Sequence, residues 1–210
     1  MLGIDLFENV SNTDVLELLK CIGIKTKKYK KNTNIIRTGQ KIDFLCVMLE
    51  GIAHTVKVDS TGKSSVIEKL KMNDIFGHNI VCLGIQKSPV DVIAQTDCDV
   101  LFLPFEKVIT PCAKLCPYHL QLIKNVMKMI SSRNSILNNK IDIIAQKTTR
   151  EKILALLESY KTEERLISIP YNREEMAKFL CVDRSAMSRE LCKMRDDGIL
   201  KFYKNHFELL

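Results

Sequence analysis

The sequence predicts an α+β fold in three successive parts: a roll (jelly roll) of short β-strands, one long helix, and two short helices followed by a β-hairpin. Three observations predict it. Short apolar or alternating runs fill residues 33–105, a heptad pattern of apolar residues fills 120–144, and capped helical segments fill 172–196. The 210 residues fit one large domain or two ordinary ones. We expect the domains 1–116, 117–147 and 148–210.

The first part begins with a predicted short helix, 14–21, and a basic stretch. Strand-like runs follow, separated by turn signals such as Asp59-Ser60-Thr61-Gly62 and Asn73-Asp74. These runs are 35–36, 44–49, 52–58, 66–70, 90–94 and 100–103. Many short strands at close spacing are typical of a sandwich or jelly roll.

The middle part carries a seam of residues with alternating spacings of three and four. Its members are Leu120, Ile123, Met127, Ile130, Asn134, Leu137, Ile141 and Ile144. So strict a heptad pattern favours packing against a partner helix, and Asn134 at an a-type position is suited to fixing register and oligomeric state. The simpler alternative is one long helix lying on its own domain. We expect a homodimer formed through this seam.

The last part opens with a capping box, Thr148 to Glu151, which starts a new helix and suggests a hinge near 143–148. Asn172 is placed to cap a helix over 173–180, and a turn at 181–183 leads into a second helix over 184–196. The tail 201–209 alternates around Lys204-Asn205 as a hairpin would. Two short helices, a tight turn and a wing-like hairpin form a helix-turn-helix unit.

The second of these helices has two distinct faces. Met187, Leu191 and Met194 share the apolar face, and the opposite face carries Ser185, Ser188, Arg189, Cys192 and Asp196. A recognition helix presents such polar residues to the major groove, where arginine reads guanine and serine reaches bases or phosphates. Arg184, Asn172 and Arg173 are better placed for phosphates. The alternative is a solvated helix face in an unrelated bundle.

The segment 169–191 resembles the winged helix of the Crp/Fnr family of bacterial transcription regulators. The order of the parts is also that family's order, and Gly51 and Gly77 resemble its two roll glycines. The resemblance implies a cyclic-nucleotide-binding-like roll, a long dimerisation helix and a winged helix-turn-helix. It further implies a homodimer that binds a two-fold operator in double-stranded DNA and acts with RNA polymerase. The residues at Ser185, Ser188 and Arg189 would read bases. Ser185 replaces a glutamate common in the family, which changes the expected base preference.

The effector pocket is expected around Gly77, His78, Ser88 and Pro89. Cyclic-AMP-binding members of the family carry Gly-Glu at the positions of Gly77-His78. At the positions of Ser88-Pro89 they carry Arg-Ser or Arg-Thr. A buried phosphodiester without an arginine is costly to desolvate. We therefore expect no tight binding of cyclic AMP and a different small-molecule or redox signal. For His78 alone, a satisfied turn histidine is the simpler interpretation.

One cysteine cluster, Cys112, Cys116 and His119, lies where the roll meets the long helix. It could supply ligands to a metal or to haem iron, or form a thiol switch, and at this position a ligand would influence helix packing. The alternative is that these cysteines are small buried hydrophobic residues. An N-terminal iron–sulfur cassette is not expected, because Cys21 stands alone there.

The sequence also argues against several other classes of protein. The longest stretch without charge, 75–86, is too short to span a membrane, and the N-terminus lacks the features of a signal peptide. We therefore expect a cytoplasmic protein. A cupin-like enzyme would need a metal set on the strands, where we find only His54 and His78. Besides the DNA-binding regulator and the cupin-like enzyme, a third possibility is a regulatory subunit that binds a protein partner through the roll. The net charge of +7 is concentrated outside 148–210, so DNA binding is inferred from helix geometry, not bulk charge.

Overall fold

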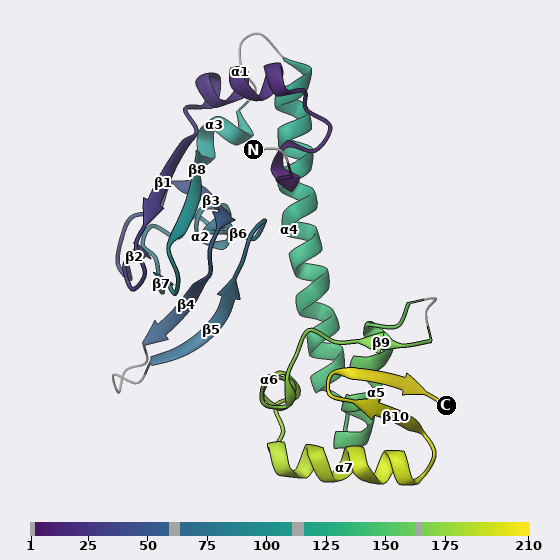
Figure 1. Ribbon diagram of the computed structural model, residues 1–210. Helices are drawn as coiled ribbons and strands as arrows, with labels where there is room; N and C mark the ends of the chain where they lie inside the picture. Colours follow the sequence, from purple (N-terminus) through teal and green to yellow (C-terminus); the bar gives the residue numbers. More distant parts are fainter. Residues whose placement is uncertain (1–2, 59–63, 111–115, 163–164) are drawn as a thin grey trace. The chain divides into compact units, whose positions relative to one another are not determined.

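A computed structural model describes residues 3–58, 64–110, 116–162 and 165–210 (Figure 1). The chain divides into two compact units, Met1–Ser132 and Arg133–Leu210. The division falls within the long helix α4, Pro117–Ile144, so each unit includes one half of that helix.

The first unit contains two four-stranded antiparallel sheets, with strand orders β1-β8-β3-β6 and β2-β7-β4-β5. The first sheet consists of β1 Lys25–Tyr29, β8 Cys98–Pro104, β3 Phe44–Glu50 and β6 Ile75–Phe76. The second consists of β2 Asn34–Ile36, β7 Asp91–Ala94, β4 Ala53–Val58 and β5 Ser64–Leu70. This is the expected roll of short strands.

Strand β3 is apolar at almost every position because both of its faces are buried. Cys46 and Met48 point into the core between the two sheets. Leu45 and Val47 point the other way, into a second core covered by helices. Side chains alternate along a strand, so a strand covered on both sides gives a continuous apolar run instead of an alternating one.

The helices of this second core are η1 Asp5–Phe7, α1 Asn12–Ile22, α3 Phe105–Ile109 and the first half of α4. Asn125, buried on α4, holds the N-terminal segment in place: its amide donates to the carbonyl oxygens of Leu6 at 2.9 Å and Glu8 at 2.8 Å. Gly51 has a φ of +89°, and a Cβ there would collide with the carbonyl oxygen of Asp97. Only glycine fits that turn.

The heptad seam of α4 lies largely outside the packed core of the chain. Leu122, Val126 and Met129 on another face are buried. Among the seam residues, Leu120, Met127, Leu137 and Ile141 are 54%, 63%, 47% and 57% exposed. The first half of the helix therefore packs on the first unit, as the simpler alternative held, mainly through a face other than the seam; of the seam residues, Ile130 also contacts that core.

The second unit consists of the end of α4, three helices and a three-stranded antiparallel sheet ordered β10-β11-β9. Its further elements are α5 Thr149–Ser159, β9 Ile167–Ser168, α6 Arg173–Leu180, α7 Arg184–Asp196, β10 Leu200–Tyr203 and β11 His206–Leu209. The predicted helices 173–180 and 184–196, the Thr148 capping box and the hairpin are all confirmed.

Some elements differ from the prediction. The basic stretch after the first helix contains strand β1, which pairs with β8 over its whole length. Strands β6 and β9 and the short helices α2 His78–Cys82 and α3 were not predicted. His78 thus begins a helix and does not lie on a strand. Within the described ranges, no helix is both long enough and apolar enough to cross a membrane.

Candidate nucleic-acid interface

Helix α6 begins at a complete capping box. The side-chain oxygen of Asn172 accepts the backbone N–H groups of Glu174 and Glu175, each at 2.9 Å. The carboxylate of Glu175 accepts the N–H of Asn172 at 3.0 Å in return. A cap of this kind fixes the first residue of the helix, and so the entry of the chain into the two-helix unit.

The turn between α6 and α7 is made by Cys181, whose φ of +54° is left-handed. The N–H of Val182 donates to the carbonyl of Ala177 at 3.1 Å. Asp183 then caps α7, because its carboxylate accepts the N–H of Ala186 at 2.8 Å. The two helices are thereby joined at a fixed angle around one core, which includes Met187.

Helix α7 shows the two predicted faces. Met187, Leu191 and Met194 are at most 1% exposed. On the other side, Arg184, Ser185 and Arg189 are exposed and Ser188 is half-buried; Cys192 and Asp196 are also exposed. Arg189 makes no ion pair within the described parts of the chain. The arginine and serine groups of the first two turns of α7 are therefore available to an external partner.

Arg150 on α5 was not identified from the sequence. Its Nε lies 2.6 Å from Oε1 of Glu190, and its Nη2 lies 2.8 Å from Oδ2 of Asp197. These carboxylates raise the pKa of Arg150 through hydrogen bonds, and the guanidinium connects α5 to α7 and to the residue just after the end of α7. No local pattern marks such a residue, because its partners lie far along the chain.

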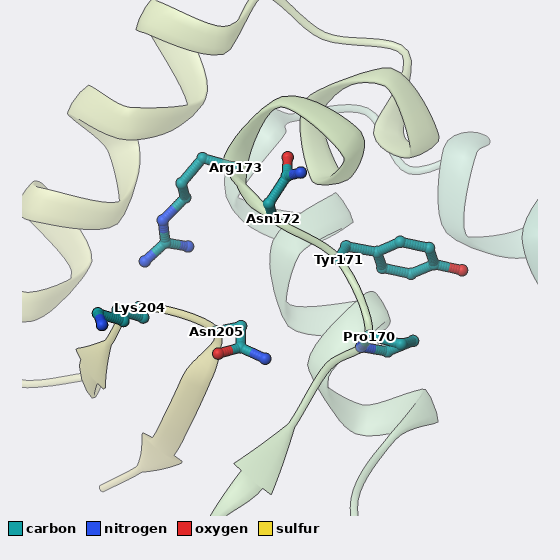
Figure 2. A pocket seen from close by; sticks show the side chains of 6 residues that line it. All are labelled: Pro170, Tyr171, Asn172, Arg173, Lys204 and Asn205. Atoms are coloured by element: carbon teal, nitrogen blue, oxygen red, sulfur yellow. The ribbon is translucent and has the colours of Figure 1, made fainter.

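Asn172 and Arg173 lie beside the wing. Together with Pro170, Tyr171, Lys204 and Asn205 they line one cavity (Figure 2). The guanidinium of Arg173 lies 4.8 Å from the ring centre of Phe202 and 5.0 Å from that of Phe207. Its position is thus fixed by two aromatic rings of the wing.

The predicted effector residues lie at the start of α2 and in the turn before β7. Gly77 caps α2 with a φ of +77°, and His78 follows as a half-buried residue. Ser88 is 2% exposed, and its hydroxyl donates to the carbonyl of Val90 at 2.7 Å. That hydroxyl is occupied within its own turn, and Pro89 has no backbone N–H. None of these four residues is an arginine or a lysine, the permanently charged groups that would balance a phosphate.

The predicted metal or haem cluster is described only in part, since Cys112 lies outside the described residues. Cys116 and His119 are buried, at 7% and 3% exposure. The Nε2 of His119 lies 3.0 Å from the carbonyl oxygen of Val108, so it carries the proton. In the described ranges, no group of three or more potential ligands could hold a metal ion.

Two family models match the chain. The cyclic nucleotide-binding domain matches residues 26–114, and the Crp-like helix-turn-helix domain matches residues 151–210. The transcriptional activator protein FnrL of Cereibacter sphaeroides is 24% identical over 188 residues, covering 83% of this chain and 71% of FnrL. The anaerobic regulatory protein of Bacillus subtilis is 23% identical over 197 residues, covering 90% of this chain and 80% of that protein.

Solved structures share the fold at low identity. CprK in complex with OCPA is similar with a TM-score of 0.65 and 13% identity, over 92% of this chain and 91% of that one. The c-di-GMP responsive global regulator CLP of Xanthomonas campestris gives a TM-score of 0.60 and 16% identity, over 95% of this chain and 99% of that one. Both similarities extend across the roll, the long helix and the helix-turn-helix unit.

Proposed function

The chain belongs to the Crp/Fnr family of transcription regulators, and we propose that it works as a homodimer that binds a two-fold operator with the exposed face of α7. The observation that carries this proposal is that α7 has one buried apolar face and one exposed polar face. Arg189 and Ser185 are exposed and Ser188 half-exposed, while Met187 and Leu191 anchor the helix in its core. A helix held this way is suited to entering the major groove.

Each exposed residue has a role in this proposal. Arg189 reads guanine through two parallel hydrogen bonds, for which the planar guanidinium has the matching geometry. Ser185 and Ser188 contact bases or nearby phosphates. Arg184 and Asn172, at the starts of α7 and α6, contact phosphates and set the position of the helix without specifying sequence.

Dimerisation is assigned to the seam of α4, because a single chain leaves Met127, Leu137 and Ile141 exposed. The polar seam member Asn134 is also exposed in the single chain and would fix the register of two helices. The roll, 1–116, would receive a signal; the helix, 117–147, would join two copies; and 148–210 would bind DNA. As a regulator of transcription it would act in the cytoplasm together with RNA polymerase.

We test the DNA-reading assignment by fluorescence anisotropy on an operator selected in vitro from random duplexes. Arg189→Ala is expected to weaken operator binding by about 5- to 150-fold and to leave binding to random duplex unchanged. Arg195→Ala is the matched control, because Arg195 is also exposed on α7 but lies in its last turn. Equal operator affinity and specificity in Arg189→Ala and the parent would contradict the assignment. A chain that binds no duplex would favour the regulatory-subunit alternative.

A further inference from the structure

The second half of α4 contacts the rest of the second unit through few residues. Of residues 134–144, all of which the structure describes, only Lys140, Ile143 and Ile144 are not exposed. Ile144 belongs to the seam. Ile143 is 2% exposed and lies in the core that also contains Leu180 of α6. Lys140 and Ile143 are neighbours on one face of α4, and this face is turned towards the chain's own second unit.

Lys140 contacts the first helix of the helix-turn-helix unit through an aromatic ring. Its Nζ lies 5.1 Å from the ring centre of Phe179, near the end of α6. Both side chains are half-buried, so the attraction between the cation and the face of the ring is partly shielded from water. The helix that carries the seam therefore holds α6 at a second point besides Ile143.

Phe179 is the first of three aromatic rings that contact one another in a row. Its ring centre lies 5.0 Å from that of Tyr171, and the Tyr171 ring lies 6.2 Å from that of Tyr160, just after α5. The hydroxyl of Tyr160 donates to that of Tyr171 at 3.3 Å. Figure 2 shows the Tyr171 side chain pointing away from the guanidinium of Arg173. Phe179 is thus supported from behind and offers Lys140 a fixed partner.

The sequence argues against a role for Lys140 in the seam itself. With Leu120 at position a of the heptad, Lys140 is at position g, where a lysine in a parallel pair of helices would form an ion pair with an e residue of the partner. The e positions of α4 are Lys124, Ser131, Asn138 and Ala145. None of them carries a negative charge, so the contact of Lys140 is with the ring of its own chain.

Helices α6 and α7 share one core, which includes Met176 and Met187, and this core also takes in Ile143 of α4. In a homodimer, the position of each α7 relative to the two-fold axis therefore depends on how firmly α4 holds this core. A single contact at Ile143 would allow α6 and α7 to tilt about that point. The second contact, at Lys140, opposes the tilt.

We propose that Lys140 is a positioning residue that fixes the separation of the two α7 helices, and with it the half-site spacing that the dimer accepts. Two-fold DNA-binding proteins require half-sites whose spacing matches the separation of their recognition helices. The inference rests on the proposed function, because it concerns a dimer that reads two half-sites. Lys140 acts through α6 and touches no DNA.

The test compares duplexes that differ only in the spacing of the half-sites. The probes are the operator selected for the parent and versions of it shortened or lengthened by one base pair, and fluorescence anisotropy measures their binding. Lys140→Met keeps the apolar stem but removes the charge, and it is expected to reduce the preference for the selected spacing by about three- to tenfold, as loss of a cation–π contact would. Lys140→Arg keeps the cation and is expected to retain the preference.

Two further measurements separate positioning from general damage. Sedimentation velocity is expected to show the same dimer in Lys140→Met and the parent, and affinity for a duplex with a single half-site is expected to be unchanged. Lys124→Met is the matched control, because Lys124 is exposed on the first half of α4, and it is expected to keep the spacing preference. Phe179→Leu removes the ring, so adding it to Lys140→Met is expected to cause no further loss of preference.

The inference is overturned if Lys140→Met keeps the parent's spacing preference, or if it loses affinity equally for every spacing and for the single half-site. Dissociation of Lys140→Met into monomers would assign Lys140 to the seam and would also overturn it. In each case, operator binding that depends on Arg189 leaves the proposed function standing. A parent that binds no duplex at any spacing would overturn the proposed function and this inference together.

Discussion

Arg150 of α5 forms a 2.6 Å ion pair with Glu190 in the middle of α7, and the same guanidinium reaches Asp197 just beyond the end of that helix at 2.8 Å. The Arg150 and Glu190 side chains are 35% and 21% exposed, so the pair is partly shielded from water. Two contacts from one rigid, planar group restrict both the position and the rotation of α7. This geometry makes Arg150 a positioning residue for Arg189, which lies on the same helix.

We expect Arg150→Met to weaken operator binding several-fold while leaving the far-ultraviolet circular dichroism unchanged. The methionine keeps the stem but releases α7 from α5, so the reading face of α7 is less well oriented. Anisotropy on the selected operator measures the effect. Random-duplex binding serves as the internal reference, because loss of orientation affects base reading more than phosphate contacts.

The control for this prediction is a double-mutant cycle with Glu190→Gln. Because the two residues act through one contact, the double variant is expected to bind the operator no more weakly than Arg150→Met alone. Strictly additive losses would show that Arg150 acts on DNA binding by another route, such as direct contact with a phosphate.

Leu137→Glu is expected to convert the dimer into a monomer at micromolar concentration. Leu137 is 47% exposed in the single chain, so the substitution leaves the fold of the chain intact, yet it places two like charges together in the helix seam. Sedimentation velocity measures the oligomeric state. A monomer would also bind a two-fold operator far more weakly, since only one half-site is engaged at a time.

Ile136→Glu is the matched control, because Ile136 is 67% exposed on the same helix but is not a seam residue. It is expected to remain a dimer. If both variants dissociate, the interface is broader than the seam; if neither does, the seam is not the dimer contact.

Local signals predicted the helical part of the second unit well, and long-range contacts explain what was missed. Asn172 and Thr148 carry their capping partners three residues away, so the helix starts could be identified from sequence. Strand β1 contains three lysines and looks like a solvated stretch, because its pairing with β8 is visible only in the fold. Arg150 was missed for the same reason, since Glu190 is 40 residues away.

Cys181→Gly is expected to stabilise the protein by about 0.5–1 kcal/mol. The φ of +54° at Cys181 costs an L-residue about 1–2 kcal/mol, and glycine removes that cost while adding some entropy to the unfolded chain. Urea denaturation measures the change. The contrasting control is Cys192→Gly, which lies within α7 and is expected to destabilise by a few tenths of a kcal/mol. A loss of stability in Cys181→Gly would mean that the thiol makes a contribution larger than the backbone strain.

Cyclic AMP is expected to show no low-micromolar binding at the roll. The Ser88 hydroxyl is committed to Val90, and neither Pro89 nor His78 replaces the arginine that would balance a buried phosphate. Calorimetry of the full-length protein with cyclic AMP measures this. Saturable heat with low-micromolar affinity would contradict the prediction.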